Sequence, residues 1–165
     1  MRELLRGRLA VVVAAAGYGK TTAVRRWLRE AGERAVVVDD VHPDRLPDPP
    51  GAPDRLVLIS REPIPVSALL RYDLGAPVEI GPRQLALSAR RTAALLASQH
   101  GVTDPEAAAA VHELTAGWPA LALLAGAHAA EPADVLSRPG TPLHDYIAAE
   151  VLGPSPTTPS TCSPT

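Results

Sequence analysis

A glycine-containing segment near the start of the chain has the residue types that could bind phosphate. The pattern A-x-x-x-x-G-K-T spans Ala14–Thr21. In such a loop the backbone N–H groups surround a phosphate, and the following helix directs its positive dipole end at the anion. Lys20, the only lysine among 16 basic residues, would reach the β- and γ-phosphates, and the Thr21 hydroxyl would ligate magnesium. Gly17 and Gly19 provide the unhindered backbone that the tight curl needs.

Two carboxylates and an arginine follow later apolar runs and would extend this chemistry. Asp39 and Asp40 end the run VVVDD, which has the form of a Walker B motif. Asp39 would hold magnesium through water, and Asp40 would polarise the attacking water. Arg61 directly follows LIS and would sense the γ-phosphate or contact one of the carboxylates. The alternatives are a glycine-rich turn without a ligand, an acidic turn and an exposed loop arginine.

Short apolar strands and a helix must position these residues. The helix is expected over residues 20–31, where apolar residues recur at helical spacing and Gly32 suits a C-cap. A proline-rich loop is expected at 42–53, and a short helix at 66–71. Alternation of strands and crossovers predicts an α/β fold, a P-loop NTPase parallel sheet of about four strands followed by an all-helical lid. The strands are expected at residues 9–14, 35–39, 55–60 and 78–80.

The pattern becomes purely helical from Ser88 onward. It divides the chain into a nucleotide-binding core at 1–82, a helical lid at 83–152 and a tail at 153–165. The tail is rich in Pro, Ser and Thr and is expected to be disordered. An apolar face formed by Leu143, Tyr146, Ile147 and Val151 is expected to dock on the lid or to cause self-association. The lid helices are expected at residues 89–99, 105–117, 119–130 and 141–152.

Composition excludes several classes of function. The hydrophobic fraction of 46% suffices for a core, and the formal net charge of −2 argues against non-specific nucleic-acid binding. The single cysteine, Cys162, cannot form an internal disulfide, and the five histidines show no metal-ligand spacing. No basic helix-turn-helix, apolar membrane span or signal peptide is visible, so we expect no DNA-binding motif, no membrane partner and a cytoplasmic protein.

With these residues in place, the chain resembles the STAND class of signalling ATPases, in particular the ATP-binding domain of large LuxR-type bacterial transcriptional regulators. The resemblance implies binding of ATP with Mg²⁺, slow hydrolysis and a nucleotide-controlled switch. It further implies that Pro119, within a GxP motif, packs near the adenine. The resemblance is carried by residues 14–28, 36–42, 56–63 and 113–126, and weakly by 143–152. It implies nucleotide contacts from Ala14, Gly17, Tyr18, Gly19, Lys20, Thr21, Thr22 and Pro119.

The chain departs from that family in ways that leave other functions open. Only residues 31–35 separate the first helix from the VVVDD strand, where the family has a long insert, and the family's later helical regions are missing. We therefore expect a shortened or truncated member whose missing strand belongs at the sheet edge. One alternative is a non-catalytic nucleotide-binding remnant, an interaction module or a non-functional gene fragment. Another is a small P-loop kinase, against which the GWP segment counts.

Overall fold

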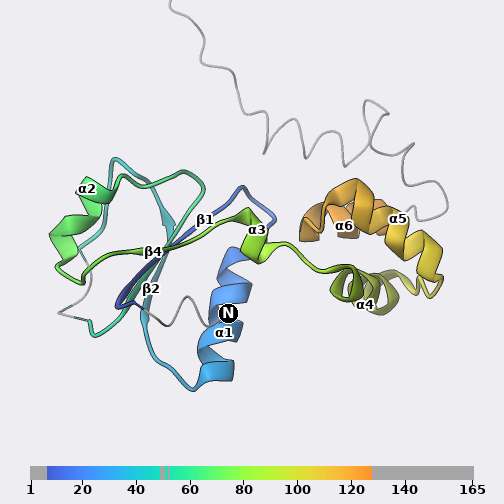
Figure 1. Cartoon of the computed structure of the whole chain (residues 1–165), viewed down its shortest axis with the longest axis horizontal. Helices are drawn as coiled ribbons and strands as arrows, with labels where there is room; N and C mark the ends of the chain where they lie inside the picture. Colours follow the sequence, from blue (N-terminus) through green and yellow to red (C-terminus); the bar gives the residue numbers. More distant parts are fainter. Residues whose placement is uncertain (1–6, 49–50, 52, 128–165) are drawn as a thin grey trace, which may run out of the picture.

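The structure is a computed structural model, and it describes residues 7–48, 51 and 53–127. Within this part, a sheet with its covering helices forms one region and a group of helices forms a second, the lid (Figure 1). The expected helix at 141–152, its apolar face and the tail at 153–165 lie outside the described residues. Among the described residues, no helix combines the length and the apolar character that a membrane crossing requires.

The four expected strands form one parallel sheet, which confirms an α/β architecture. The spatial order is β2-β3-β1-β4, so β2 and β4 form the two edges of the sheet. In a parallel sheet all carboxyl ends lie along one border, so the segments after β1, β3 and β2 are brought together there. The strands are β1 (Leu9–Val13), β2 (Val36–Val41), β3 (Leu56–Ser60) and β4 (Val78–Ile80).

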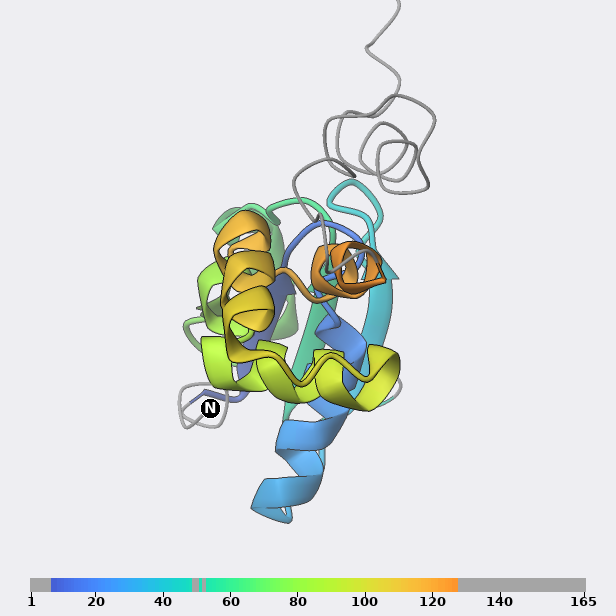
Figure 2. The same cartoon turned by 90° about the vertical axis from the view of Figure 1, so that its right-hand side faces the viewer.

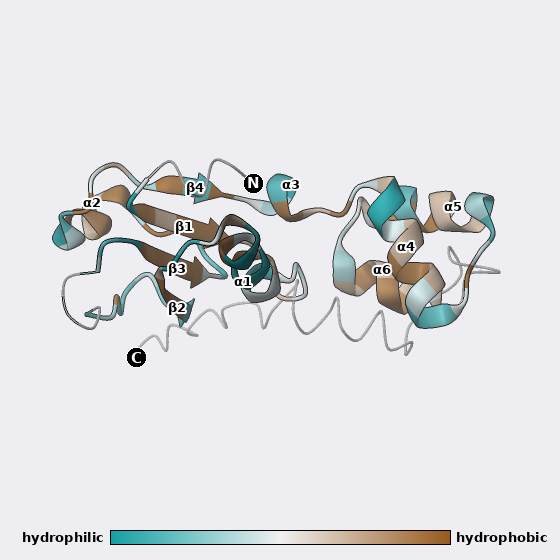
Figure 3. Cartoon of the chain, turned by 90° about the horizontal axis from the view of Figure 1, so that it is seen from below, coloured by the Kyte–Doolittle hydropathy of each residue, from teal (hydrophilic) through white to brown (hydrophobic). Residues whose placement is uncertain are grey.

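Both faces of the sheet are covered, which explains why β1 and β3 are uninterrupted apolar runs. Helix α1 (Lys20–Ala31) covers one face through Val24 and Leu28. The opposite face packs against α2 (Val66–Leu69) and against Ile64. The expected helix at 66–71 is in fact α2 followed by a 3-10 turn, Leu70–Tyr72. Figure 3 shows β1 and β3 in the brown of hydrophobic residues, whereas parts of the covering helices α1 and α2 are teal.

Three helices make the lid, α4 (Ala89–His100), α5 (Pro105–Thr115) and α6 (Pro119–Gly126). Their bounds follow local signals, because Gly101 ends α4 in a left-handed conformation and the Asp104 carboxylate accepts the N–H groups of Glu106 and Ala107. Figure 2 shows the three helices gathered in one group. A short helix that sequence patterns did not predict, α3 (Pro82–Leu85), precedes them, and its Leu85 packs with the sheet.

Candidate nucleotide site

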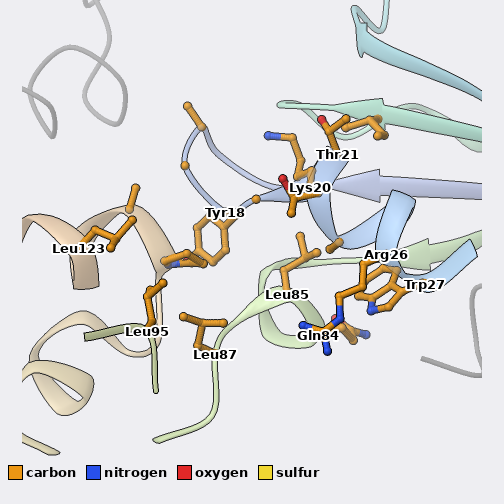
Figure 4. A pocket seen from close by; sticks show the side chains of 18 of the residues that line it. Tyr18, Lys20, Thr21, Arg26, Trp27, Gln84, Leu85, Leu87, Leu95 and Leu123 are labelled. Carbon is orange, nitrogen blue, oxygen red and sulfur yellow. The ribbon is translucent and has the colours of Figure 1, made fainter. Parts of the chain in front are cut away.

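A cavity of about 1000 Å³ lies at the carboxyl border of the sheet, between the segment that follows β1 and the lid. In Figure 4, Leu95 and Leu123 approach from the lid and Leu87 from the segment that leads into it, whereas Lys20 and Thr21 lie beyond Tyr18. Of the site residues predicted from the sequence, all except Ala14 line this cavity. The predicted residues in its lining are Gly17, Tyr18, Gly19, Lys20, Thr21, Thr22, Asp39, Asp40, Arg61 and Pro119.

The segment between β1 and α1 curls tightly into the start of the helix. Gly17 and Gly19 have φ angles of 76° and 68°, in the region that side chains disfavour, so the chain curls back on itself there. Gly19 is the N-cap of the 12-residue helix α1 and brings no side chain to the first-turn N–H groups. These groups and the positive end of the helix dipole therefore face the cavity border, where they would favour an anion.

The Lys20 ammonium lies across this loop. Its Nζ donates hydrogen bonds to the carbonyl oxygens of Ala14, at 2.7 Å, and Ala15, at 3.0 Å. Ala14 thus contributes a carbonyl behind the loop and does not line the cavity. Burial, reinforced by the positive charge of Arg61, lowers the pKa of Lys20, although Asp39 and Asp40 act in the opposite direction. A partly desolvated ammonium interacts strongly with an anion that reaches it.

A β-bulge explains how two adjacent aspartates reach one cavity. Neighbouring residues of a regular strand point to opposite faces of the sheet. In β2 the register against β3 shifts between Val38 and Val41, so Asp39 and Asp40 together stand opposite a single residue, Ile59. Asp40 has a φ of 56°, a left-handed conformation that aspartate tolerates better than most residues. The bulge also carries β2 to Val41, beyond the strand end expected at Asp39.

The Thr21 hydroxyl donates a hydrogen bond to Oδ2 of Asp39. The first turn of α1 and the end of β2 are therefore in direct contact, although the strand β3 lies between β1 and β2. Two hard oxygen atoms side by side suit Mg²⁺, which prefers oxygen ligands and is commonly held by few protein groups together with phosphates. Among the described residues, no group of three or more His, Cys, Asp or Glu could hold a metal by itself.

Arg61 is brought to the same border by β3. Its Nε lies 3.9 Å from Oδ1 of Asp40, and both side chains are largely exposed. One of the two roles considered for Arg61, contact with a carboxylate of the pair, is therefore present. At this exposure the ion pair contributes little to stability. Its main effect is to keep a positive charge beside Asp40 at the mouth of the cavity.

The lid wall contains residues that sequence reasoning missed. One face of α4 contributes Arg91, Ala94, Leu95 and Ser98, which recur at the spacing of a helix face. Leu123 of α6 also lines the cavity, whereas Leu121 of the same helix is buried. The sequence shows that these four residues of α4 share one face of a helix, but it does not show which part of the protein that face contacts. Gln84, Leu87, Arg26 and Trp27 were likewise not singled out, although they line the cavity.

The apolar part of the cavity lies beside the GWP segment. Pro119 and Ala120, at the start of α6, line the cavity together with Tyr18. Burial raises the pKa of the Tyr18 phenol, which moves it further from physiological pH. The cavity thus combines the charged groups at the strand ends with apolar groups beside Pro119, which suits a ligand with an anionic part and an apolar part.

Comparison of the chain with protein-family models and with curated protein sequences gave no match.

Proposed function

We propose that this chain binds ATP with Mg²⁺ in the cavity through a P-loop at residues 14–21. The observation that carries the proposal is the meeting of Lys20, the Thr21–Asp39 pair and the N-terminus of α1 at one end of a cavity of about 1000 Å³. That volume lies at the upper end of the range for small-molecule sites and would admit a nucleotide. The choice of ATP over another nucleoside triphosphate rests on the family resemblance.

Each residue of the site would have a separate role in binding and hydrolysis. Lys20 would exchange its bonds to the Ala14 and Ala15 carbonyls for phosphate oxygens and neutralise their charge. Thr21 and Asp39 would hold Mg²⁺, which neutralises phosphate charge further when bound. Asp40 would orient the attacking water, and Arg61 beside it would respond to the γ-phosphate.

Slow hydrolysis by these groups would suit a switch, since the bound nucleotide changes state only rarely. We accordingly propose a signalling switch module of a LuxR-type transcriptional regulator, on the strength of the resemblance. The cavity supports such a role because one wall comes from the sheet region and the other from the lid. A ligand that contacts both walls would bias their arrangement.

Replacement of Lys20 tests the phosphate site. Lys20→Ala removes a charge-assisted contact worth about 1.5–3 kcal/mol, so ATP affinity measured by calorimetry with Mg²⁺ should fall roughly 10- to 100-fold. Arg29→Ala is the matched control, because it removes one positive charge from an exposed position in the last turn of the same helix. Unchanged affinity in a folded Lys20→Ala protein would contradict the proposal.

The aspartate pair tests hydrolysis separately from binding. Asp40→Asn should leave Mg²⁺-ATP binding nearly intact and slow phosphate release about 100-fold or more, because the water loses its orienting carboxylate. Asp39→Asn should instead weaken the dependence of ATP binding on Mg²⁺. Hydrolysis at the parent rate in both variants would show that these roles are wrong. A parent chain that binds ATP and releases no phosphate would support the non-catalytic alternative.

A further inference from the structure

The lid touches the P-loop directly through the residues around Trp118. The indole Nε1 of Trp118 donates a hydrogen bond to the carbonyl oxygen of Ala16, at 3.2 Å. The backbone N–H of Ala120 donates to the carbonyl oxygen of Gly17, also at 3.2 Å. The Trp118 and Tyr18 rings stack with centroids 4.7 Å apart and planes 21° from parallel. Two successive loop carbonyls and one loop side chain are therefore held by the lid.

The direction of these carbonyls matters for anion binding. A loop that binds phosphate must direct its N–H groups inward, and the carbonyl groups of the same peptide units must then point outward. A carbonyl withdrawn from water needs a hydrogen-bond partner, or its orientation costs free energy. The Trp118 indole and the Ala120 amide supply these partners for the carbonyl groups of Ala16 and Gly17.

We infer that Trp118 is a positioning residue that holds the P-loop in its phosphate-binding shape, so that the lid sets the affinity of the loop for a triphosphate. The inference rests on the proposed function. Trp118 does not line the cavity, whereas its neighbours Pro119 and Ala120 do. Its effect on the ligand is therefore indirect and passes through Ala16 and Gly17.

The backbone around Trp118 is anchored well enough to perform this role. The Trp118 N–H donates to the carbonyl of Thr115 at 2.9 Å, and the Trp118 carbonyl accepts the N–H of Ala122 at 2.9 Å. The preceding residue, Gly117, accepts the N–H of Leu87 at 2.8 Å, which joins this segment to the connection between core and lid. The indole therefore projects from a turn between α5 and α6 whose backbone is fixed by hydrogen bonds.

Coupling of this kind is reciprocal. If the lid contacts favour the binding shape of the loop, a bound triphosphate must favour the lid contacts by the same free energy. A triphosphate without a base would therefore protect the Ala120 amide from hydrogen exchange, although that amide bonds to a loop carbonyl and not to the ligand.

The variant that separates the contacts is Trp118→Phe, which keeps an aromatic ring for Tyr18 and removes the donor to Ala16. The probe is inorganic tripolyphosphate with Mg²⁺, which has no base, and ATP is titrated in parallel. We expect both affinities to fall by the same factor, about 3- to 10-fold, because one hydrogen bond to the loop is lost. Without ligand, the amides of residues 16–19 should exchange faster than in the parent.

Tyr72→Phe is the matched control. It also removes one side-chain donor to a backbone carbonyl, the 2.7 Å bond from the Tyr72 hydroxyl to Pro47, on the sheet face away from α1. Its tripolyphosphate affinity should equal that of the parent. An equal loss in Tyr72→Phe, or unchanged tripolyphosphate affinity in Trp118→Phe, would overturn the positioning role. A loss for ATP alone would overturn it too, since Trp118 would then act at the base.

Measurements on the parent chain keep the inference testable even if Trp118→Phe does not fold. Tripolyphosphate should slow exchange of the Ala120 amide, and an unchanged rate at saturating ligand would overturn the inference. A parent that binds neither tripolyphosphate nor ATP would overturn the proposed function and this inference together. A parent that binds both, with no effect of Trp118→Phe, would overturn the inference alone.

Discussion

The sheet region and the lid bury their side chains in different ways. In the sheet region, strands held by parallel ladders present large residues to both faces, among them the fully buried Leu9, Leu56 and Ile59. The lid has a smaller interior in which Leu96 and Val111 are surrounded mainly by alanines. Gly126 shows how closely its helices approach, because a Cβ atom there would lie 2.2 Å from Cδ2 of Leu96.

The two regions contribute differently to the site. The sheet region supplies Lys20, Asp39, Asp40 and Arg61, and a core on both faces of the sheet supports the strand ends that carry them. The lid supplies apolar surface, the charged Arg91 and the donors to the carbonyl groups of Ala16 and Gly17 in the segment after β1. Small side chains bury less apolar area per residue, so the lid should be the less stable region. A weakly held lid can respond to a ligand, whereas the strand ends must not move.

Matched truncations in the two interiors test this comparison most strongly. Leu96→Ala and Ile59→Ala each remove a fully buried side chain, at a cost of about 2–5 kcal/mol. Leu96→Ala should release the lid at low urea concentration and leave the sheet folded, whereas Ile59→Ala should lower the midpoint of the whole transition. Circular dichroism and hydrogen exchange in urea would distinguish these results. A single shared transition, shifted equally by both changes, would show that the regions unfold as one unit.

Replacement of Gly117, in the turn that joins the lid to the segment before α4, should have a smaller effect on stability and also tests the link between the lid and the site. Gly117 has a φ of 73°, and a Cβ atom there would lie 2.2 Å from the carbonyl oxygen of Leu87. Gly117→Ala should therefore cost about 2–3 kcal/mol and weaken tripolyphosphate binding, since it displaces the turn that holds Trp118.

Gly101→Ala is the control for backbone strain alone. Gly101 has a similar φ of 68°, and an added Cβ would meet no atom of the described residues within 4 Å. Gly101→Ala should lower the free energy of unfolding by about 1–2 kcal/mol and leave tripolyphosphate affinity unchanged. Thermal unfolding and calorimetry measure the two quantities. If both glycine variants bind tripolyphosphate equally, the turn at Gly117 does not control the loop.

Local signals account for the parts of the fold that could be predicted. Helix α1 follows the glycine-rich segment and ends at Gly32, whose φ of 67° is the conformation expected of a C-cap glycine. Asp104 and Pro105 likewise mark the start of α5. The apolar runs of β1 and β3 identify buried strands, because parallel strands covered on both faces need no polar alternation. Each of these signals acts between residues close together in the chain.

Non-local contacts decided the remainder of the fold. The strand β2 continues through Asp39 and Asp40 because Val41 pairs with Ser60, a partner that no local pattern identifies. The short helix α3 forms where Leu85 can pack against the sheet. The residues that the α4 face meets depended on how the lid packs against the segment between β1 and α1.

The sequence by itself determined which residues carry charge, hydroxyl groups and backbone freedom, and therefore the candidate residues at 14–21, 39–40 and 61. Their side chains and the local glycine conformations follow from residue type, which is independent of the fold. Only the tertiary structure decided that the Thr21 hydroxyl meets Asp39, that a bulge brings both aspartates to one cavity, and that the Trp118 indole reaches the Ala16 carbonyl. Those contacts join residues up to 102 positions apart, and only sheet order and lid packing bring such residues within bonding distance.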